Sequence, residues 1–307
     1  MTYSEHRYES YDGLSLYYRS YGESEDVAVC LPGLTRNSKD FDDLARHLAR
    51  PEAPTGQRPW RVLCPDLRGR GQSEHDPKPA NYHPGTYVKD VWTLLDGLGI
   101  RRVALIGTSL GGLMSMLMAD QQPGRLRGVV LNDVGPEIPP AAVARILQYV
   151  GRTPPAADWE SAAAEAQRNY GLAFPGVPDD FWPRYVRRSW AENTEGRPAP
   201  DMDPAIGDAL RKAHGAVKVL RWLRRYGLLK RVGGVPIDTW DAFAALTMPC
   251  LLLQGELSDV LTGNIVARMQ ERKPDLEVVL VPDRGHAPLL DEPIARAAID
   301  DFLTRLP

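Results

Sequence analysis

Four short apolar runs, with helix-like segments between them, restrict the fold of this chain more than any other feature of the sequence. Each run is almost entirely apolar, as in strands that are buried on both faces, and the runs are residues 27–31, 61–64, 103–106 and 128–131. The segments between them that predict helices are residues 40–48, 87–98 and 110–120. Strand, helix and strand in alternation is the order of βαβ crossovers, so the pattern predicts an α/β fold with a parallel sheet.

Further strands are predicted at both ends of the chain. Residues 5–11 and 14–21 flank Asp12-Gly13, a two-residue turn signal that predicts an antiparallel hairpin. Later in the chain, strands are predicted at residues 249–254 and 277–281, and helices at 264–272 and 293–306. We therefore expect a mostly parallel, eight-stranded sheet with helices on both faces, built from residues 1–134 and 248–307.

The stretch between these two parts, residues 135–247, loses the strand and helix alternation. It is rich in Pro, Ala and Trp, and helical segments are predicted at residues 141–150, 159–170, 179–191 and 205–229. We interpret it as an inserted helical cap, or lid, domain.

Composition narrows the class of partner. The net charge of −3 over 307 residues provides no field that attracts nucleic acid, so we expect a small-molecule partner. No apolar run reaches membrane-spanning length, so we expect no membrane partner. No apolar segment follows a basic start, so we expect no secretory signal. The three cysteines, Cys30, Cys64 and Cys250, lie in apolar strand-like runs without a Cys-x-x-Cys pair, which favours a reducing, cytoplasmic location.

Cofactor and metal motifs are missing from the sequence. No Gly-x-Gly-x-x-Gly follows the first buried strand and no Gly-Lys-Ser/Thr occurs, which argues against dinucleotide and nucleotide cofactors. The sequence also lacks His-Glu-x-x-His and any cysteine cluster. We predict that the protein uses no cofactor and no metal.

A serine between glycines is the strongest catalytic signal. The motif Gly-Thr-Ser-Leu-Gly-Gly at residues 107–112 follows the predicted strand 103–106 and leads into a helix. In this context Gly-x-Ser-x-Gly forms a sharp strand-to-helix turn that lifts Ser109 above the sheet. The alternative is an ordinary turn of small residues, but the position after a buried strand favours a nucleophile. The N-terminus of the following helix predicts that the Leu110 N–H is an oxyanion donor.

A serine hydroxyl needs a nearby base, and His286 is the best candidate among the six histidines. It lies in the loop after the predicted last strand, at the carboxyl edge where parallel-sheet enzymes carry out their chemistry. The base in turn needs an acid, and Asp259, in the loop after the strand at 249–254, is our prediction for it. The chain order is then Ser, Asp, His.

Four motifs in the expected order make the whole chain resemble the α/β-hydrolase superfamily of esterases, lactonases and carbon–carbon bond hydrolases. They are Leu-Pro-Gly-Leu at 31–34, Pro-Asp-Leu-Arg-Gly-Arg-Gly-Gln-Ser at 65–73, the serine turn at 107–112, and the loops of Asp259 and His286. The resemblance implies that the Leu34 N–H is the second oxyanion donor, although Pro32 stands where many relatives have histidine. It also makes Asp133 an alternative acid, because some family members have the acid directly after that strand. Asp259 remains our preferred residue.

These residues predict a serine hydrolase that cleaves a carboxylic ester or lactone through an acyl-enzyme. The substrate is expected to be a small-molecule or oligomeric ester. A serine at position 109 argues against the dehalogenases and epoxide hydrolases of the superfamily, which use aspartate there. Two alternatives stay open: hydrolysis of a carbon–carbon bond in a diketone-type product of aromatic degradation, and a non-catalytic ligand receptor.

Overall fold

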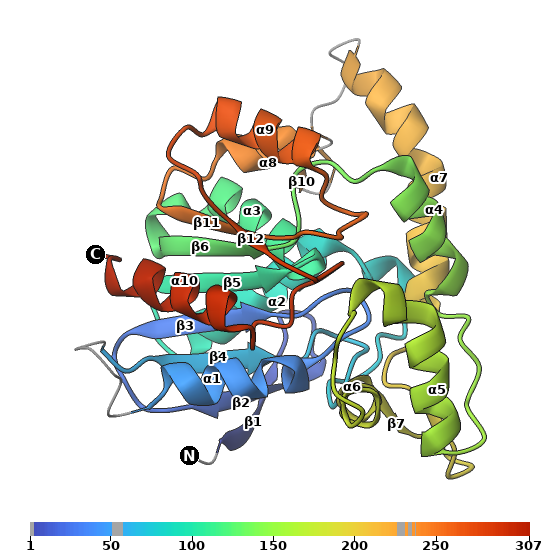
Figure 1. The fold of residues 1–307 in the computed structure, drawn as a ribbon. Helices are drawn as coiled ribbons and strands as arrows, with labels where there is room; N and C mark the ends of the chain where they lie inside the picture. Colours follow the sequence, from blue (N-terminus) through green and yellow to red (C-terminus); the bar gives the residue numbers. More distant parts are fainter. Residues whose placement is uncertain (1–2, 51–57, 226–230, 233–234, 237) are drawn as a thin grey trace.

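One eight-stranded sheet runs through the protein in the order β1-β2-β4-β3-β5-β6-β11-β12 (Figure 1). The structure is a computed structural model that describes residues 3–50, 58–225, 231–232, 235–236 and 238–307. The strands of the sheet are Ser4–Glu9 (β1), Ser15–Tyr21 (β2), Val27–Leu31 (β3), Arg61–Pro65 (β4), Val103–Thr108 (β5), Leu126–Asn132 (β6), Cys250–Gly255 (β11) and Glu277–Val281 (β12). Only the pairs β1·β2 and β2·β4 are antiparallel. The prediction of a mostly parallel, eight-stranded sheet is confirmed.

The expected hairpin joins β1 to β2. Its register ends at the pair Glu9 and Ser15. Gly13 has a φ of +91°, which only glycine adopts readily, and the Ser10 hydroxyl donates to Asp12 and accepts from the Leu14 N–H. The local sequence thus determines this turn.

Helices cover both faces of the sheet, as the alternation predicts. One face packs against Pro84–Gly97 (α2), Leu110–Gln121 (α3), Thr239–Ala244 (α8) and Gly263–Arg272 (α9), and the other against Asp42–Leu48 (α1) and Pro293–Thr304 (α10). Successive residues of β3 face opposite sides: Val29 belongs to the first core and Cys30 to the second. This explains why the central strands are apolar at every position.

Four helices from the middle of the sequence lie together beside the sheet (Figure 1). They are Pro140–Tyr149 (α4), Trp159–Tyr170 (α5), Phe181–Ser189 (α6) and Ala205–Arg225 (α7). The helix predicted at 179–191 is shorter than expected because Trp190–Glu192 (β7) pairs with Pro198–Pro200 (β8). Residues 226–229, the end of the helix predicted at 205–229, lie outside the described residues. α5 and α6 share a small core of their own that includes Phe174, Phe181 and Trp182.

Short elements complete the chain. They are the 3₁₀ helices Ser38–Phe41 (η1), Pro79–Asn81 (η2), Pro123–Arg125 (η3) and Gly171–Ala173 (η4), and the paired strands Arg231–Val232 (β9) and Val235–Pro236 (β10). After them α8 returns to the sheet, where Trp240 and Phe243 join the core beside α3.

The three cysteines are free thiols that lie buried in β3, β4 and β11. Burial raises the pKa of the Cys250 thiol to about 12 and raises that of Cys64 well above its usual value. These side chains therefore pack as small apolar groups. In the part of the chain that the structure describes, no helix is long and apolar enough to cross a membrane.

Candidate active site

Ser109 occupies the tight turn between β5 and α3, with a φ of 53° that a non-glycine residue seldom adopts. The glycines around it are required by space. A Cβ on Gly107 would lie 2.4 Å from the Gly111 backbone, and one on Gly111 would lie 2.0 Å from the Leu31 carbonyl oxygen. Any larger residue would push the turn out of contact with β3, which explains the Gly-x-Ser-x-Gly pattern in physical terms.

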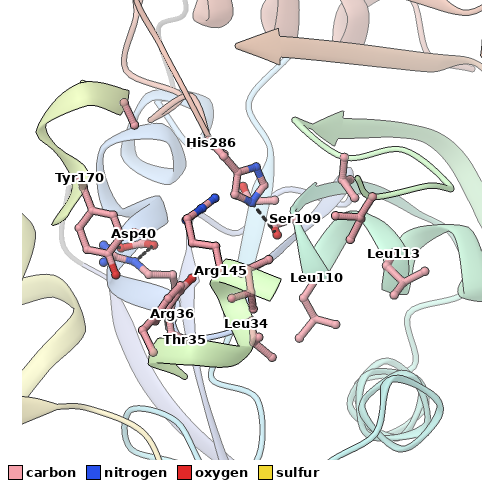
Figure 2. A pocket seen from close by; sticks show the side chains of 18 of the residues that line it. Leu34, Thr35, Arg36, Asp40, Ser109, Leu110, Leu113, Arg145, Tyr170 and His286 are labelled. Carbon is pink, nitrogen blue, oxygen red and sulfur yellow. Dashed lines mark hydrogen bonds and ion pairs between the residues drawn. The ribbon is translucent and has the colours of Figure 1, made fainter. Parts of the chain in front are cut away.

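Ser109 and His286 lie together, as their positions in the sequence predict (Figure 2). His286 Nε2 lies 2.9 Å from Ser109 Oγ, although 177 positions separate the two residues. The His286 side chain is about one-sixth exposed, with an exposed fraction of 17%. It can therefore reach both the serine and a bound substrate.

The loop of His286 is attached to two neighbours. The Gly285 N–H donates to the Ala173 carbonyl of η4 at 2.7 Å, and a Cβ on Gly285 would lie 2.7 Å from Ala173 Cβ. On the other side, the Asn132 amide donates to the Pro288 carbonyl at 2.9 Å. These contacts fix the histidine loop between the end of β6 and the helices beside the sheet.

The carboxylate that faces His286 belongs to Asp133. Its Oδ2 lies 2.7 Å from His286 Nδ1. The side chain is fully buried and also accepts hydrogen bonds from the Gly255 N–H at 2.9 Å and the Ser258 hydroxyl at 2.6 Å. These donors solvate the buried carboxylate in place of water.

Asp259, the acid that we expected, does not contact His286 in this structure and instead pairs with Arg145 of α4. Arg145 Nε and Nη2 each donate to the Asp259 carboxylate at 2.9 Å. The reason for the difference is position. Asp133 directly follows β6, and its N–H donates to the Leu253 carbonyl of β11, whereas Asp259 lies several residues beyond Gly255, on the side of the helices. The expected contact between Asp259 and His286 is therefore corrected: the structure brings the alternative residue, Asp133, to the histidine.

The two predicted oxyanion donors lie beside the serine (Figure 2). Leu110 is the first residue of α3, so its N–H has no acceptor within the helix. The Gly33 carbonyl accepts a hydrogen bond from the Arg36 N–H at 3.2 Å. Because the peptide bond between Gly33 and Leu34 is trans, the Leu34 N–H points the opposite way from that carbonyl. The buried Arg70 side chain donates to the Leu34 carbonyl at 3.0 Å and so holds the next peptide as well.

A family profile, that of the alpha/beta hydrolase fold, matches residues 27–293, most of the chain. The chain is an α/β-hydrolase. The match begins at β3 and includes β12, so it covers strands of the sheet on both sides of the central helices.

Several relatives of this α/β-hydrolase match nearly its whole length. It is 32% identical to the 3-hydroxybutyrate-oligomer hydrolase of Cupriavidus necator over 290 residues, which cover 94% of this chain and 92% of the relative. A crystal structure of an α/β-hydrolase from Novosphingobium aromaticivorans superposes with a TM-score of 0.83 at 39% identity and covers 99% of both chains. The structure of E-2-(acetamidomethylene)succinate hydrolase shares the fold, with a TM-score of 0.75 at 22% identity over 99% of both chains.

The hydrolase has a cavity of about 790 Å³ above Ser109. Its floor is formed by Ser109, Leu34 and Leu110, and the helices beside the sheet supply its opposite wall, which includes Ile146, Tyr149 and Ile206. Three large apolar side chains that line it are exposed to solvent: Ile138, Leu172 and Leu257. The volume lies within the range of sites that enclose a small molecule.

Several polar side chains lie together on one side of the cavity. Arg36 donates through Nε and Nη2 to Asp40, each at 2.6 Å, and its guanidinium lies 4.2 Å from the centre of the Tyr185 ring. The rings of Tyr149 and Tyr170 lie beside it. Burial raises the pKa of all three phenols, so they are neutral at pH 7 and able to donate hydrogen bonds to a ligand.

Three residues near the serine and the histidine were not predicted from the sequence. Ser258, Asn132 and Arg145 contribute through contacts that arise only when β6 lies beside β11 and α4 lies over the sheet edge. The adjacency of Ser258 to the predicted acid was the one available hint. Among the described residues, no group of three or more His, Cys, Asp or Glu side chains is arranged to hold a metal ion.

Proposed function

We propose that this enzyme hydrolyses carboxylic esters by two-step acyl transfer, with Ser109 as nucleophile, His286 as base and Asp133 as the acid that orients the base. The observation that carries the proposal is the continuous chain of contacts, 2.9 Å from Ser109 Oγ to His286 Nε2 and 2.7 Å from His286 Nδ1 to Asp133 Oδ2.

Each contact has a chemical role in the proposed reaction. As Ser109 attacks the carbonyl carbon, His286 Nε2 takes the hydroxyl proton and then transfers it to the leaving alcohol. The Asp133 carboxylate favours the tautomer with the proton on Nδ1 and stabilises the imidazolium. The N–H groups of Leu34 and Leu110 donate to the developing oxyanion. Water, activated by the same histidine, then releases the acyl group.

The substrate that we propose is a short ester of a hydroxy acid, including its oligomers. Support comes from the Cupriavidus necator relative, whose name specifies 3-hydroxybutyrate oligomers, and which matches 94% of this chain. A cavity of about 790 Å³ suits a short oligomer. The exposed apolar side chains of Ile138, Leu172 and Leu257 suit a substrate with methyl-bearing units.

We also propose that residues 135–247 act as a cap on the core formed by 1–134 and 248–307. Residues of α4, α5, α6 and α7 line the cavity opposite Ser109, so they are placed to select the substrate. The buried free cysteines support a cytoplasmic location, where thiols stay reduced.

The test compares wild-type protein with Ser109→Ala on p-nitrophenyl esters of increasing acyl length and on the dimer of 3-hydroxybutyrate. We expect wild-type turnover, and a loss of at least ~10³-fold in kcat for Ser109→Ala, because the nucleophile is removed while the oxyanion donors remain. Mass spectrometry of quenched wild-type reactions is expected to show the acylated serine. Undiminished activity in Ser109→Ala contradicts the mechanism. Carbon–carbon cleavage products, or binding without turnover, favour the two alternative functions instead.

A further inference from the structure

Arg145 lines the cavity, and part of its guanidinium makes no hydrogen bond within the described residues. Its Nε and Nη2 donate to Asp259. Within the described residues, Nη1 donates no hydrogen bond, so its two N–H groups and the second N–H of Nη2 remain for a ligand. The side chain is 42% exposed and lines the cavity together with Ser109 and His286.

The other arginine close to the serine is less available. Arg36 makes the same side-on pair with Asp40, but its side chain is only 16% exposed and the Tyr185 ring covers it at 4.2 Å. Figure 2 shows Arg145 extending toward the His286 side of the cavity, whereas Arg36 lies lower, beside Tyr170. Of these two arginines, Arg145 is therefore the one more available to a substrate.

A guanidinium that already holds one carboxylate can bind another. In this same protein the buried Arg68 side chain contacts three carboxylates, those of Asp12, Asp76 and Asp90. Each uses a different part of the planar donor set. Arg145 uses only the edge formed by Nε and Nη2, which leaves the remaining edge for a second carboxylate.

We propose that Arg145 binds a free carboxylate of the substrate and that Asp259 is a positioning residue that holds the guanidinium in place. This inference rests on the proposed ester hydrolysis and names its preferred substrates: short esters that carry a carboxylate. In a hydroxy acid oligomer the carboxylate lies at one end of the chain. Binding it at Arg145 fixes the distance from that end to the ester above Ser109, so cleavage occurs at a constant position from the carboxyl end.

The experiment uses a neutral substrate of the same shape. The dimer of 3-hydroxybutyrate is compared with the dimer whose terminal carboxylate is a primary carboxamide, and hydrolysis of the internal ester is followed by chromatography. We expect wild-type kcat/KM to be about 10- to 100-fold higher for the acid, the range of one charge-assisted hydrogen-bonded pair. Because the pair is partly exposed, the preference should fall as salt is added.

Three variants decide between the outcomes. Arg145→Gln should lose the preference, with kcat/KM falling about 10- to 100-fold for the acid and less than about 3-fold for the amide, and Arg145→Lys should retain part of it. Arg305→Gln, which breaks an exposed two-bond pair with Glu277 outside the cavity, is the matched control and should keep the wild-type ratio.

The two levels of the proposal fail in different ways. Wild-type protein that cleaves both dimers equally well, or an Arg145→Gln variant that loses equal activity on both, overturns the role of Arg145 and leaves ester hydrolysis intact. Wild-type protein that cleaves neither dimer nor any p-nitrophenyl ester overturns the proposed function and the inference together.

Discussion

Two neighbouring loops each carry an aspartate, and they differ in almost every physical respect. The loop after β6 places Asp133 at the sheet edge, fully buried, with Gly255, Ser258 and His286 around its carboxylate. The loop after β11 places Asp259 farther out, 53% exposed, with its carboxylate on Arg145. The strands beneath them are paired in parallel, so the contrast arises within a few residues of the sheet edge.

The contrast separates two tasks. A carboxylate that must hold a histidine in one orientation benefits from rigid surroundings, and a strand end supplies them. The carboxylate of Asp259, which we propose positions Arg145, lies instead where α4 contacts the loop after β11. The proposed first task therefore depends on the sheet, and the proposed second task on the contact between α4 and the loop after β11.

The largest effect is expected at the buried aspartate. Asp133→Asn keeps the side-chain shape but removes the negative charge and favours the wrong histidine tautomer, so kcat on p-nitrophenyl butyrate should fall ~10³- to 10⁴-fold. Steady-state kinetics measure the loss, and circular dichroism checks that the variant is folded. Activity within about 3-fold of wild type would remove Asp133 from the mechanism.

A smaller effect is expected where the two loops touch. Ser258 donates to Asp133 and accepts from the N–H groups of Val260 and Leu261. Ser258→Ala should lower kcat by about 10-fold and the free energy of unfolding by about 1.5–3 kcal/mol, the cost of one hydrogen bond to a charged group. Kinetics and urea denaturation measure the two quantities.

The matched control for Ser258→Ala is Ser10→Ala in the hairpin. The Ser10 hydroxyl also donates to an aspartate and accepts from a backbone N–H, but it lies at the β1–β2 turn. It should lose similar stability with unchanged kcat. An equal loss of kcat in both variants would mean that the Ser258 effect is only structural.

The smallest effect is expected at the exposed aspartate. Asp259→Asn should change kcat/KM for uncharged p-nitrophenyl esters by no more than about 3-fold, because His286 keeps its partner, Asp133. The same kinetic assay measures it. A loss comparable with that of Asp133→Asn would restore Asp259 as the acid.

The sheet could be predicted from the sequence because its signals are local. The fully apolar run Val27–Leu31 and the glycines around Ser109 each satisfy a constraint that acts over a few residues. The helix ends were predicted less accurately. The helix predicted at 179–191 ends before Trp190, because Trp190 pairs with Pro200 in a small sheet. That pairing depends on residues outside the helix, so the apolar periodicity of the helix itself gives no indication of it.

The contact between Ser109 and His286 could be anticipated from strand order, but the aspartate that contacts His286 could not. Asp133 and Asp259 both follow strands at the carboxyl edge, so spacing alone does not separate them. What separates them is that Asp133 N–H bonds to β11, and that Arg145 of α4 lies above Asp259. Both are tertiary contacts between segments more than 100 residues apart in the chain.

The hydrogen bond from Gly285 to Ala173 has a consequence for how enzymes with this fold are engineered and diverge. A chimera that received residues 135–247 from another hydrolase would also receive a new backbone course beside Gly285, where even one methyl group on the glycine would lie 2.7 Å from Ala173 Cβ. The neighbouring His286 would then shift with the graft. If residues 135–247 act as the proposed cap, we expect exchange of this whole segment to reduce turnover more often than point changes on the cavity wall.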